Sequence, residues 1–416
     1  MYENKTEQER ALLISVDTGE FDAEASLAEL YELTRSAGAE PFGSMLQKRP
    51  AKDAATCVGS GFLLDAAEMI RVHDLDLAIF DCELSPTQIR NIEKATGVRV
   101  IDRTMLILDI FALRARSKEG RLQVELAQLQ YLLPRLSGKG TALSRLGGGI
   151  GTRGPGETKL ETDRRHVRRR IAALQEKLHE VEQRRERSMQ RRKKDGIITV
   201  ALVGYTNAGK STLMNALTDA GVLAENMLFA TLDPTARALR LPHGAEVMLI
   251  DTVGLVRRLP HHLVAAFRST LEQAAQADLI LNVCDAASGE AQLHFEVAKD
   301  LLIQLGCEAP VVPVLNKCDL VPGLETLPMI GGGLRVSAMT GEGLPVLLEE
   351  IERLLQLGPV HVKLLLPFSK SGLAAQLREK GKILQEEYRP DGLWMEAELP
   401  PVLFREAQAY WVPDEV

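Results

Sequence analysis

A glycine-rich turn at the end of an apolar run most restricts what this chain can fold into. Residues 197–203 are apolar and rich in β-branched side chains, which predicts a buried strand. The strand runs into Gly204-x-x-x-x-Gly209-Lys210-Ser211, after which apolar residues recur at helical spacing. Strand, glycine loop and helix start are the context that a phosphate-binding loop requires. This context favours a phosphate site over a glycine turn that matches the pattern by chance.

Each part of this loop suits a polyphosphate. Gly204 and Gly209 let backbone N–H groups approach phosphate oxygens, and the helix N-terminus adds positive potential. Lys210 can reach the β- and γ-phosphates, and the Ser211 hydroxyl can bind Mg²⁺.

Three further predicted strands end in residues that complete a nucleotide site. The first ends in Asp251-Thr-Val-Gly254, where a carboxylate can hold Mg²⁺ through water and a glycine N–H can meet the γ-phosphate. The second ends in Asn316-Lys-Cys-Asp319, whose last carboxylate can accept hydrogen bonds from guanine N1–H and N2–H₂. Adenine lacks that donor pair and would leave the carboxylate unpaired. The third ends in Ser337-Ala338, whose backbone can contact guanine O6. Together they predict a GTP-binding domain that uses Mg²⁺.

A switch loop is expected between the phosphate loop and the Asp-x-x-Gly segment. The stretch Phe229-Ala-Thr-Leu-Asp-Pro-Thr235 lies at that place in the chain. Such a loop needs a threonine to complete the Mg²⁺ shell, and spacing alone does not separate Thr231 from Thr235.

Composition indicates a reduced, cytoplasmic protein of several domains. The chain has 416 residues, with 45% hydrophobic and 26% charged side chains. Its N-terminus is too polar for a signal peptide, and no apolar run is long enough to span a bilayer. The five cysteines form no Cys-x-x-Cys pair, as expected of reduced thiols.

The charge is distributed unevenly. The chain has a formal net charge of −7, yet residues 121–194 hold 19 Lys/Arg against 8 Asp/Glu. Apolar residues at helical spacing, Leu122 to Leu133 and Val167 to Val181, predict two antiparallel helices around a glycine-rich loop. A solvated helix face could explain the charges. Structured RNA is the favoured partner, because acids are sparse and the tip loop is basic.

The chain divides into four predicted segments of an α/β multidomain protein. Strands and helices alternate before residue 118, which predicts a small parallel sheet. The predicted segments are a parallel α/β domain, a basic helical hairpin, a GTP-binding domain and an α+β appendage, at residues 1–118, 119–196, 197–358 and 359–416. Gly59-Ser-Gly61 is interpreted as an ordinary turn rather than a phosphate loop.

Several stretches resemble the HflX family of translation-associated GTPases, within the Obg–HflX group of P-loop GTPases, over nearly the whole chain. The most specific is Gly148-Gly-Ile-Gly-Thr-Arg-Gly-Pro-Gly-Glu-Thr-Lys-Leu-Glu-Thr-Asp-Arg-Arg165. Residues 80–86, 102–112 and 229–235 are also similar to that family. The resemblance implies that the hairpin binds the large ribosomal subunit and its rRNA, and that GTP regulates splitting or rescue of stalled ribosomes. It also assigns the Mg²⁺ ligand of the switch loop to Thr231.

These observations together give a set of candidate site residues. Catalytic candidates are Lys210, Thr231, Gly254 and Asn207, metal ligands are Ser211 and Thr231, and RNA contacts are Arg153, Lys159, Arg164 and Arg165. The predicted GTP-binding residues are Gly204, Tyr205, Thr206, Asn207, Ala208, Gly209, Lys210, Ser211, Thr212, Phe229, Ala230, Thr231, Leu232, Asp233, Asp251, Thr252, Val253, Gly254, Asn316, Lys317, Cys318, Asp319, Ser337, Ala338 and Met339.

GTP hydrolysis is expected to need a group from outside the chain that orients the attacking water. Leu255 stands directly after Asp-x-x-Gly, where Ras-like enzymes place the glutamine that orients water. The missing group can come from the ribosome or from K⁺ bound at Asn207, although Asn207 can equally serve only to stabilise its loop. The expected protein is a monomer that binds GTP and GDP.

Three other functions stay open: a GTPase of large-subunit assembly, an RNA-remodelling ATPase with a regulatory GTP domain, and a regulator attached peripherally to a membrane.

Overall fold

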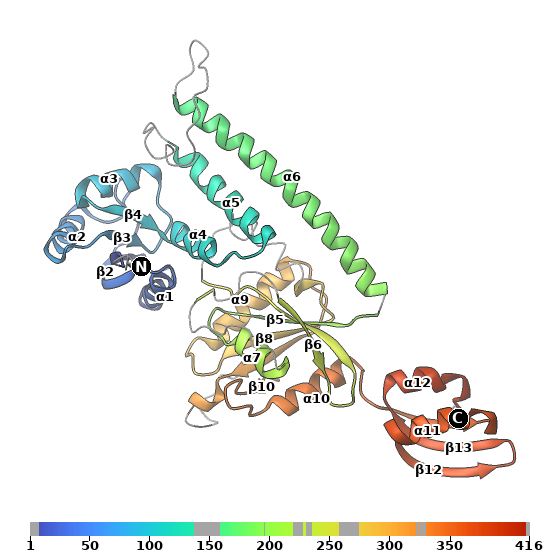
Figure 1. Cartoon of the computed structure of the whole chain (residues 1–416). Coiled ribbons are helices and arrows are strands. Elements are labelled where there is room, and N and C mark those ends of the chain that lie inside the picture. Colours follow the sequence, from blue (N-terminus) through green and yellow to red (C-terminus); the bar gives the residue numbers. More distant parts are fainter. Residues whose placement is uncertain are drawn as a thin grey trace, which may run out of the picture. The chain divides into compact units, whose positions relative to one another are not determined.

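The chain forms two compact units, which are described separately. The computed structural model describes residues 8–136, 159–194, 196–218, 228–229, 235–257, 274–321, 323 and 330–412 (Figure 1). The first unit contains the described residues of Met1–Arg191, Glu225–Pro234 and Val253–Glu272, and the second those of Arg192–Ala224, Thr235–Thr252 and Gln273–Val416. The division into four segments stays a prediction.

The first unit begins with the small parallel sheet that the sequence predicts. Its strands lie in the order β2-β1-β3-β4, and all three pairings are parallel. The elements are β1 (Arg10–Asp17), α1 (Ala23–Ser36), β2 (Glu40–Lys48), α2 (Ser60–His73), β3 (Leu77–Phe80), α3 (Pro86–Thr96), β4 (Arg99–Asp102) and α4 (Arg103–Arg114). Ser85 caps α3 as predicted, because its Oγ accepts from Gln88 N at 3.2 Å.

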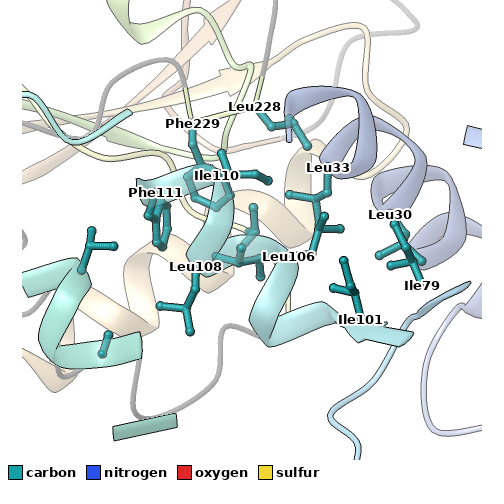
Figure 2. Packing of buried hydrophobic residues seen from close by; sticks show 14 of the residues in the cluster. Leu30, Leu33, Ile79, Ile101, Leu106, Leu108, Ile110, Phe111, Leu228 and Phe229 are labelled. Carbon is teal, nitrogen blue, oxygen red and sulfur yellow. The ribbon is translucent and has the colours of Figure 1, made fainter. Parts of the chain in front are cut away.

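Helices cover both faces of this sheet, and its central strands β1 and β3 are buried on both sides. Alternate residues of β1 enter different cores: Leu13 packs with α1 and α4, and Leu12 with α2 and α3. Figure 2 shows the first of these cores, in which Leu30 and Leu33 of α1 lie near Leu106 and Ile110 of α4.

A helical hairpin follows, as predicted. It consists of α5 (Lys118–Leu132), a short 3₁₀ turn η1 (Leu133–Arg135) and the long α6 (Lys159–Lys194). Side-chain pairs set its antiparallel register: Arg170 Nε lies 2.6 Å from Glu125 Oε1, and Arg185 Nη1 lies 2.8 Å from Glu119 Oε1. Of the predicted apolar positions of α6, Val167, Leu174 and Leu178 are buried, whereas Ile171 and Val181 are half-buried.

The prediction for α5 is incomplete. The expected positions, Leu122 through Leu133, are half-buried, whereas Val124, Ala127 and Tyr131 are the most buried apolar side chains of this helix. These three belong to the core that also contains α4. Helix α5 therefore has two apolar faces, one of which packs into the core that α4 shares with the amino-terminal sheet.

The second unit contains a six-stranded sheet in the order β10-β9-β8-β5-β7-β6. Only the β6–β7 pairing is antiparallel. The elements are β5 (Thr199–Gly204), α7 (Lys210–Thr218), β6 (Thr235–Arg240), β7 (Glu246–Asp251), β8 (Leu279–Asp285), α9 (Ala291–Gln304), β9 (Val311–Asn316), η2 (Cys318–Leu320), β10 (Leu334–Arg335) and α10 (Leu344–Leu354). The carboxyl ends of its parallel strands bring the predicted motifs to one edge of the sheet.

The chain continues into a small antiparallel sheet, which agrees with the predicted α+β appendage. Its strand order is β11-β13-β12, and helices pack on it through one buried cluster. The elements are β11 (Val360–Leu366), η4 (Phe368–Lys370), α11 (Ser371–Lys380), β12 (Lys382–Arg389), β13 (Gly392–Leu399), α12 (Pro401–Ala407) and η5 (Gln408–Tyr410). Across the described residues of both units, no helix is long and apolar enough to cross a membrane.

Candidate nucleotide-binding site

The predicted phosphate loop connects the end of β5 to the start of α7. Its two glycines are required by close contacts as well as by backbone conformation. At Gly204 (φ +151°), a Cβ would lie 2.1 Å from the Val283 carbonyl oxygen. At Gly209 (φ +89°), a Cβ would lie 2.3 Å from Asn316 Nδ2. A side chain at Gly204 would therefore displace the backbone of β8, and one at Gly209 would displace the Asn316 side chain at the end of β9.

Lys210 lies inside this loop. Its Nζ donates to the Tyr205 carbonyl at 2.8 Å and to the Gly204 carbonyl at 3.1 Å. Burial lowers the pKa of Lys210 to about 8, although the Asp251 carboxylate favours the charged form. A bound polyphosphate would supply the negative charge that keeps this buried ammonium protonated.

The predicted magnesium ligands meet between α7 and β7. Ser211 Oγ donates to Asp251 Oδ2 at 2.8 Å, and Asp251 is fully buried. Thr252 Oγ1 donates to the Leu202 carbonyl at 2.7 Å, which ties the end of β7 to β5. A hydroxyl and a carboxylate are oxygen ligands of the kind that Mg²⁺ prefers, so these residues fit the ion. Ser211 would hold it directly and Asp251 through water.

Asn316 connects the phosphate loop to the predicted base-binding loops. Its Nδ2 donates to the Ala208 carbonyl at 2.9 Å, and its Oδ1 accepts from Ala338 N at 3.0 Å. Asp319 follows on η2 with an exposed carboxylate, as a base-reading group requires. The nearby Ser337 is buried, and its Oγ accepts from Thr340 N at 3.1 Å.

Two partners of the site were not found from the sequence. Asp285, at the end of β8, lies 2.7 Å from the Lys317 ammonium and holds it beside the base-binding loop. The ring of Tyr205 stacks on His294 of α9, with 3.8 Å between ring centroids. No motif could have indicated either contact, because each joins residues that are far apart in the chain.

The predicted switch residues belong in part to the core of the first unit. Phe229 is 2% exposed and packs edge-on against Phe111 of α4, with 4.5 Å between ring centroids (Figure 2). Leu228 N donates to Ser36 Oγ at 3.1 Å. Val253 and Val256 enter the same core. Ala230, Thr231, Leu232 and Asp233 lie outside the described residues, so their roles stay predictions.

A buried ion-pair cluster holds the segment after Asp-x-x-Gly. Arg103 Nη1 donates to Asp81 Oδ1 at 2.6 Å, and its Nη2 donates to Glu29 Oε1 at 2.8 Å. The same Nη2 donates to the Arg257 carbonyl at 3.3 Å, and Arg257 N donates to Glu29 Oε1 at 3.3 Å. Gly254 and Leu255 lie buried within this segment. Residues 253–257 are therefore packed within the first unit.

The predicted RNA contacts lie at the start of α6. Arg165 is exposed, whereas Arg164 donates to the Leu136 carbonyl at 3.0 Å and so also serves the hairpin itself. Lys159 opens the helix, and Arg153 lies outside the described residues.

Comparison with known proteins agrees with this geometry. Three family models match: "GTP-binding GTPase N-terminal" at residues 24–112, "GTP-binding GTPase Middle Region" at 114–192 and "50S ribosome-binding GTPase" at 199–317. A protein from Caldanaerobacter subterraneus named GTPase HflX is 51% identical, covering 96% of this chain and 93% of its own length. Proteins of the same name from Lacrimispora saccharolytica and Escherichia coli are 46% and 42% identical, covering 97% and 94% of this chain and 96% and 93% of their own lengths.

Proposed function

We propose that this chain, which belongs to the GTPase HflX family and hydrolyses GTP, binds the large ribosomal subunit through its hairpin in the GTP state. GTP binding and hydrolysis would then drive the splitting or rescue of stalled ribosomes in the cytoplasm. The observation that carries this proposal is the basic hairpin attached directly to the GTP-binding domain.

The described surface of α6 supports an RNA partner. Arg168, Arg169 and Arg187 are exposed, and none of them forms an ion pair with a described carboxylate. Most of the helix's apolar positions face α5, so these cations lie on the side that the hairpin leaves open. Phosphate groups of structured RNA would neutralise them. The family model for residues 199–317 carries "50S ribosome-binding" in its description, which favours ribosomal RNA.

Neutralising the tip of the hairpin tests this proposal. We expect the triple variant Arg153→Gln, Lys159→Gln and Arg165→Gln to weaken binding to large subunits and to reduce the slope of log affinity against log salt by about one per charge. GTP affinity should not change. Arg164 is left intact because it stabilises the hairpin.

Arg170→Gln provides a matched control, since its guanidinium already pairs with Glu125 on the hairpin surface. This control should keep nearly the full affinity and salt slope. Unchanged ribosome binding by the triple variant would mean that these basic side chains face solvent and do not contact RNA.

Catalysis by this site needs a group that orients the attacking water. Leu255 is 4% exposed and carries no polar atom for that role. Asn207 of the phosphate loop is exposed at φ +59°, so its amide oxygen is available to a cation next to bound phosphates. We infer slow basal turnover that large subunits stimulate, with K⁺ as a contributing cofactor beside Mg²⁺.

GTP turnover should therefore be severalfold faster in K⁺ than in Na⁺ at equal ionic strength, because a bound cation offsets charge that develops on the phosphates. Asn207→Ala should make the two rates equal. Each variant is compared with itself in the two salts, so a general loss of activity does not affect the ratio. Equal rates in the unaltered protein would exclude K⁺ as a cofactor.

A further inference from the structure

Two thiols of the first unit are in contact. The Sγ atoms of Cys57 and Cys82 lie 3.4 Å apart. Cys57 is completely buried, whereas Cys82 is partly reached by solvent. A disulfide has an S–S length of about 2.05 Å, so the sulfurs need to approach by roughly 1.4 Å to form a bond. All five cysteines are described, and this is the one pair whose sulfurs are in contact.

Cys57 is presented by a rigid turn. Asp53 and Cys57 exchange two backbone hydrogen bonds of 2.9 and 3.0 Å, and the Asp53 carboxylate accepts from Ala55 N at 2.8 Å. Helix α3 anchors this turn, because Gln88 Nε2 donates to the Asp53 carbonyl at 2.8 Å. Cys57 itself has φ +67°, a left-handed conformation that is unfavourable for a residue with a Cβ. Such strain is retained where the surroundings over-determine it, often at functional positions.

Cys82 comes from a different part of the fold. It is the second residue after β3 and packs against the core that contains Cys57. The two positions are 25 residues apart in the chain, so a bond between them would tie the turn before α2 to the end of β3.

The surroundings of the two thiols shift their pKa values in opposite directions. The hydrogen bond from Cys82, together with the positive charges of Lys52 and Arg49, lowers the pKa of Cys57 despite its burial. The same hydrogen bond and burial raise the pKa of Cys82. A thiolate therefore forms at Cys57 more readily than at Cys284, whose pKa burial raises to about 12.

We propose that Cys57 and Cys82 form a reversible disulfide when the protein meets a peroxide. The thiolate sulfur attacks one peroxide oxygen and the O–O bond breaks, which leaves a sulfenic acid and a hydroxide that takes up a proton. The second sulfur then attacks the sulfenic sulfur, the S–O bond breaks, and the departing hydroxide takes the second thiol's proton. The two thiols lose two electrons, and one peroxide becomes two waters.

The pair lies next to the buried ion-pair cluster of Arg103 in the same unit. Cys82 is adjacent to Asp81, which accepts from Arg103 at 2.6 Å, and Arg103 also donates to the Arg257 carbonyl. A disulfide would therefore form one residue from the buried cluster that holds the segment after Asp-x-x-Gly.

The test treats the full-length protein with hydrogen peroxide, blocks the remaining thiols with an alkylating agent and maps the peptides by mass spectrometry. We expect a cross-linked peptide containing Cys57 and Cys82, lighter than the sum of the two reduced peptides by two hydrogen atoms. Dithiothreitol should return both thiols to the alkylatable form. Cys284, Cys307 and Cys318 should give no intramolecular cross-link under the same treatment.

Cys82→Ser provides the matched control, because Cys82 is the less buried member and serine preserves its size. This variant should give no cross-link, and amide hydrogen exchange of β3 should match that of the unaltered protein, which reports that the first unit is folded. Oxidation of Cys57 and Cys82 to separate sulfinic acids in the unaltered protein would overturn the proposal. Links between different molecules, or two thiols that stay alkylatable, would also overturn it.

Discussion

Replacing Asp319 by Asn is expected to weaken GTP binding by about a hundredfold or more, and to create binding for xanthosine triphosphate. The exposed carboxylate on η2 is predicted to accept from two guanine donors, and an amide would turn a donor toward one of them. Xanthine carries a carbonyl where guanine carries its amino group, so it accepts from that amide. Titration with fluorescent guanosine and xanthosine nucleotides measures both affinities.

Asp300→Asn is the control for this experiment. Asp300 is an exposed carboxylate on α9 of the same unit, away from the four motifs, so its loss should change neither affinity. Full retention of GTP affinity by the Asp319 variant would show that the loop after β9 does not recognise the base.

Replacing Arg103 by Met is expected to destabilise the first unit by about 3–5 kcal/mol, because the buried carboxylates of Asp81 and Glu29 would each lose the ion pair that Arg103 makes with them. The Arg103 side chain is 3% exposed, and those of Asp81 and Glu29 are 0% and 9% exposed. Both tryptophans lie in the second unit, so their fluorescence does not report on this one. Amide hydrogen exchange of β1 and β3 reports on the stability of the first unit. Protection of these amides should fall by roughly two to four powers of ten.

Arg99→Met removes an ion pair of similar length from the same domain. Arg99 Nη2 lies 2.7 Å from Glu9 Oε2, but both side chains are 54% exposed. Water and salt screen this pair, so its loss should cost less than about 1 kcal/mol. Equal losses of protection in the two variants would mean that burial does not determine how much the Arg103 cluster contributes to the stability of the first unit.

The parts of the fold that sequence predicts well are those in which local chemistry restricts the residues. A phosphate loop needs Gly204 and Gly209 at close backbone approaches, so the motif and its strand–loop–helix context can be recognised together. The parallel amino-terminal sheet is predicted for a similar reason, because its central strands β1 and β3 are buried on both faces and are mostly apolar. The cap of α3 is equally local, since Ser85 and Gln88 are three residues apart.

Long-range packing accounts for what the sequence does not predict. The buried face of α5 depends on α4 and the amino-terminal sheet, and a seam of leucines on its other face masks it. The sequence predicts Phe229 to belong to a nucleotide switch loop, yet its ring packs against Phe111. The partners of Arg103 come from α1 and from the end of β3, and no spacing in the chain relates them.

Co-sedimentation with separated ribosomal subunits tests the central claim most directly. The protein should sediment with large subunits in the presence of a non-hydrolysable GTP analogue, remain largely in the supernatant with GDP, and show little binding to small subunits in either state. Large subunits should also raise its GTP turnover. Equal binding in the two nucleotide states, or a preference for small subunits, would contradict a GTP-dependent switch that acts on the large subunit.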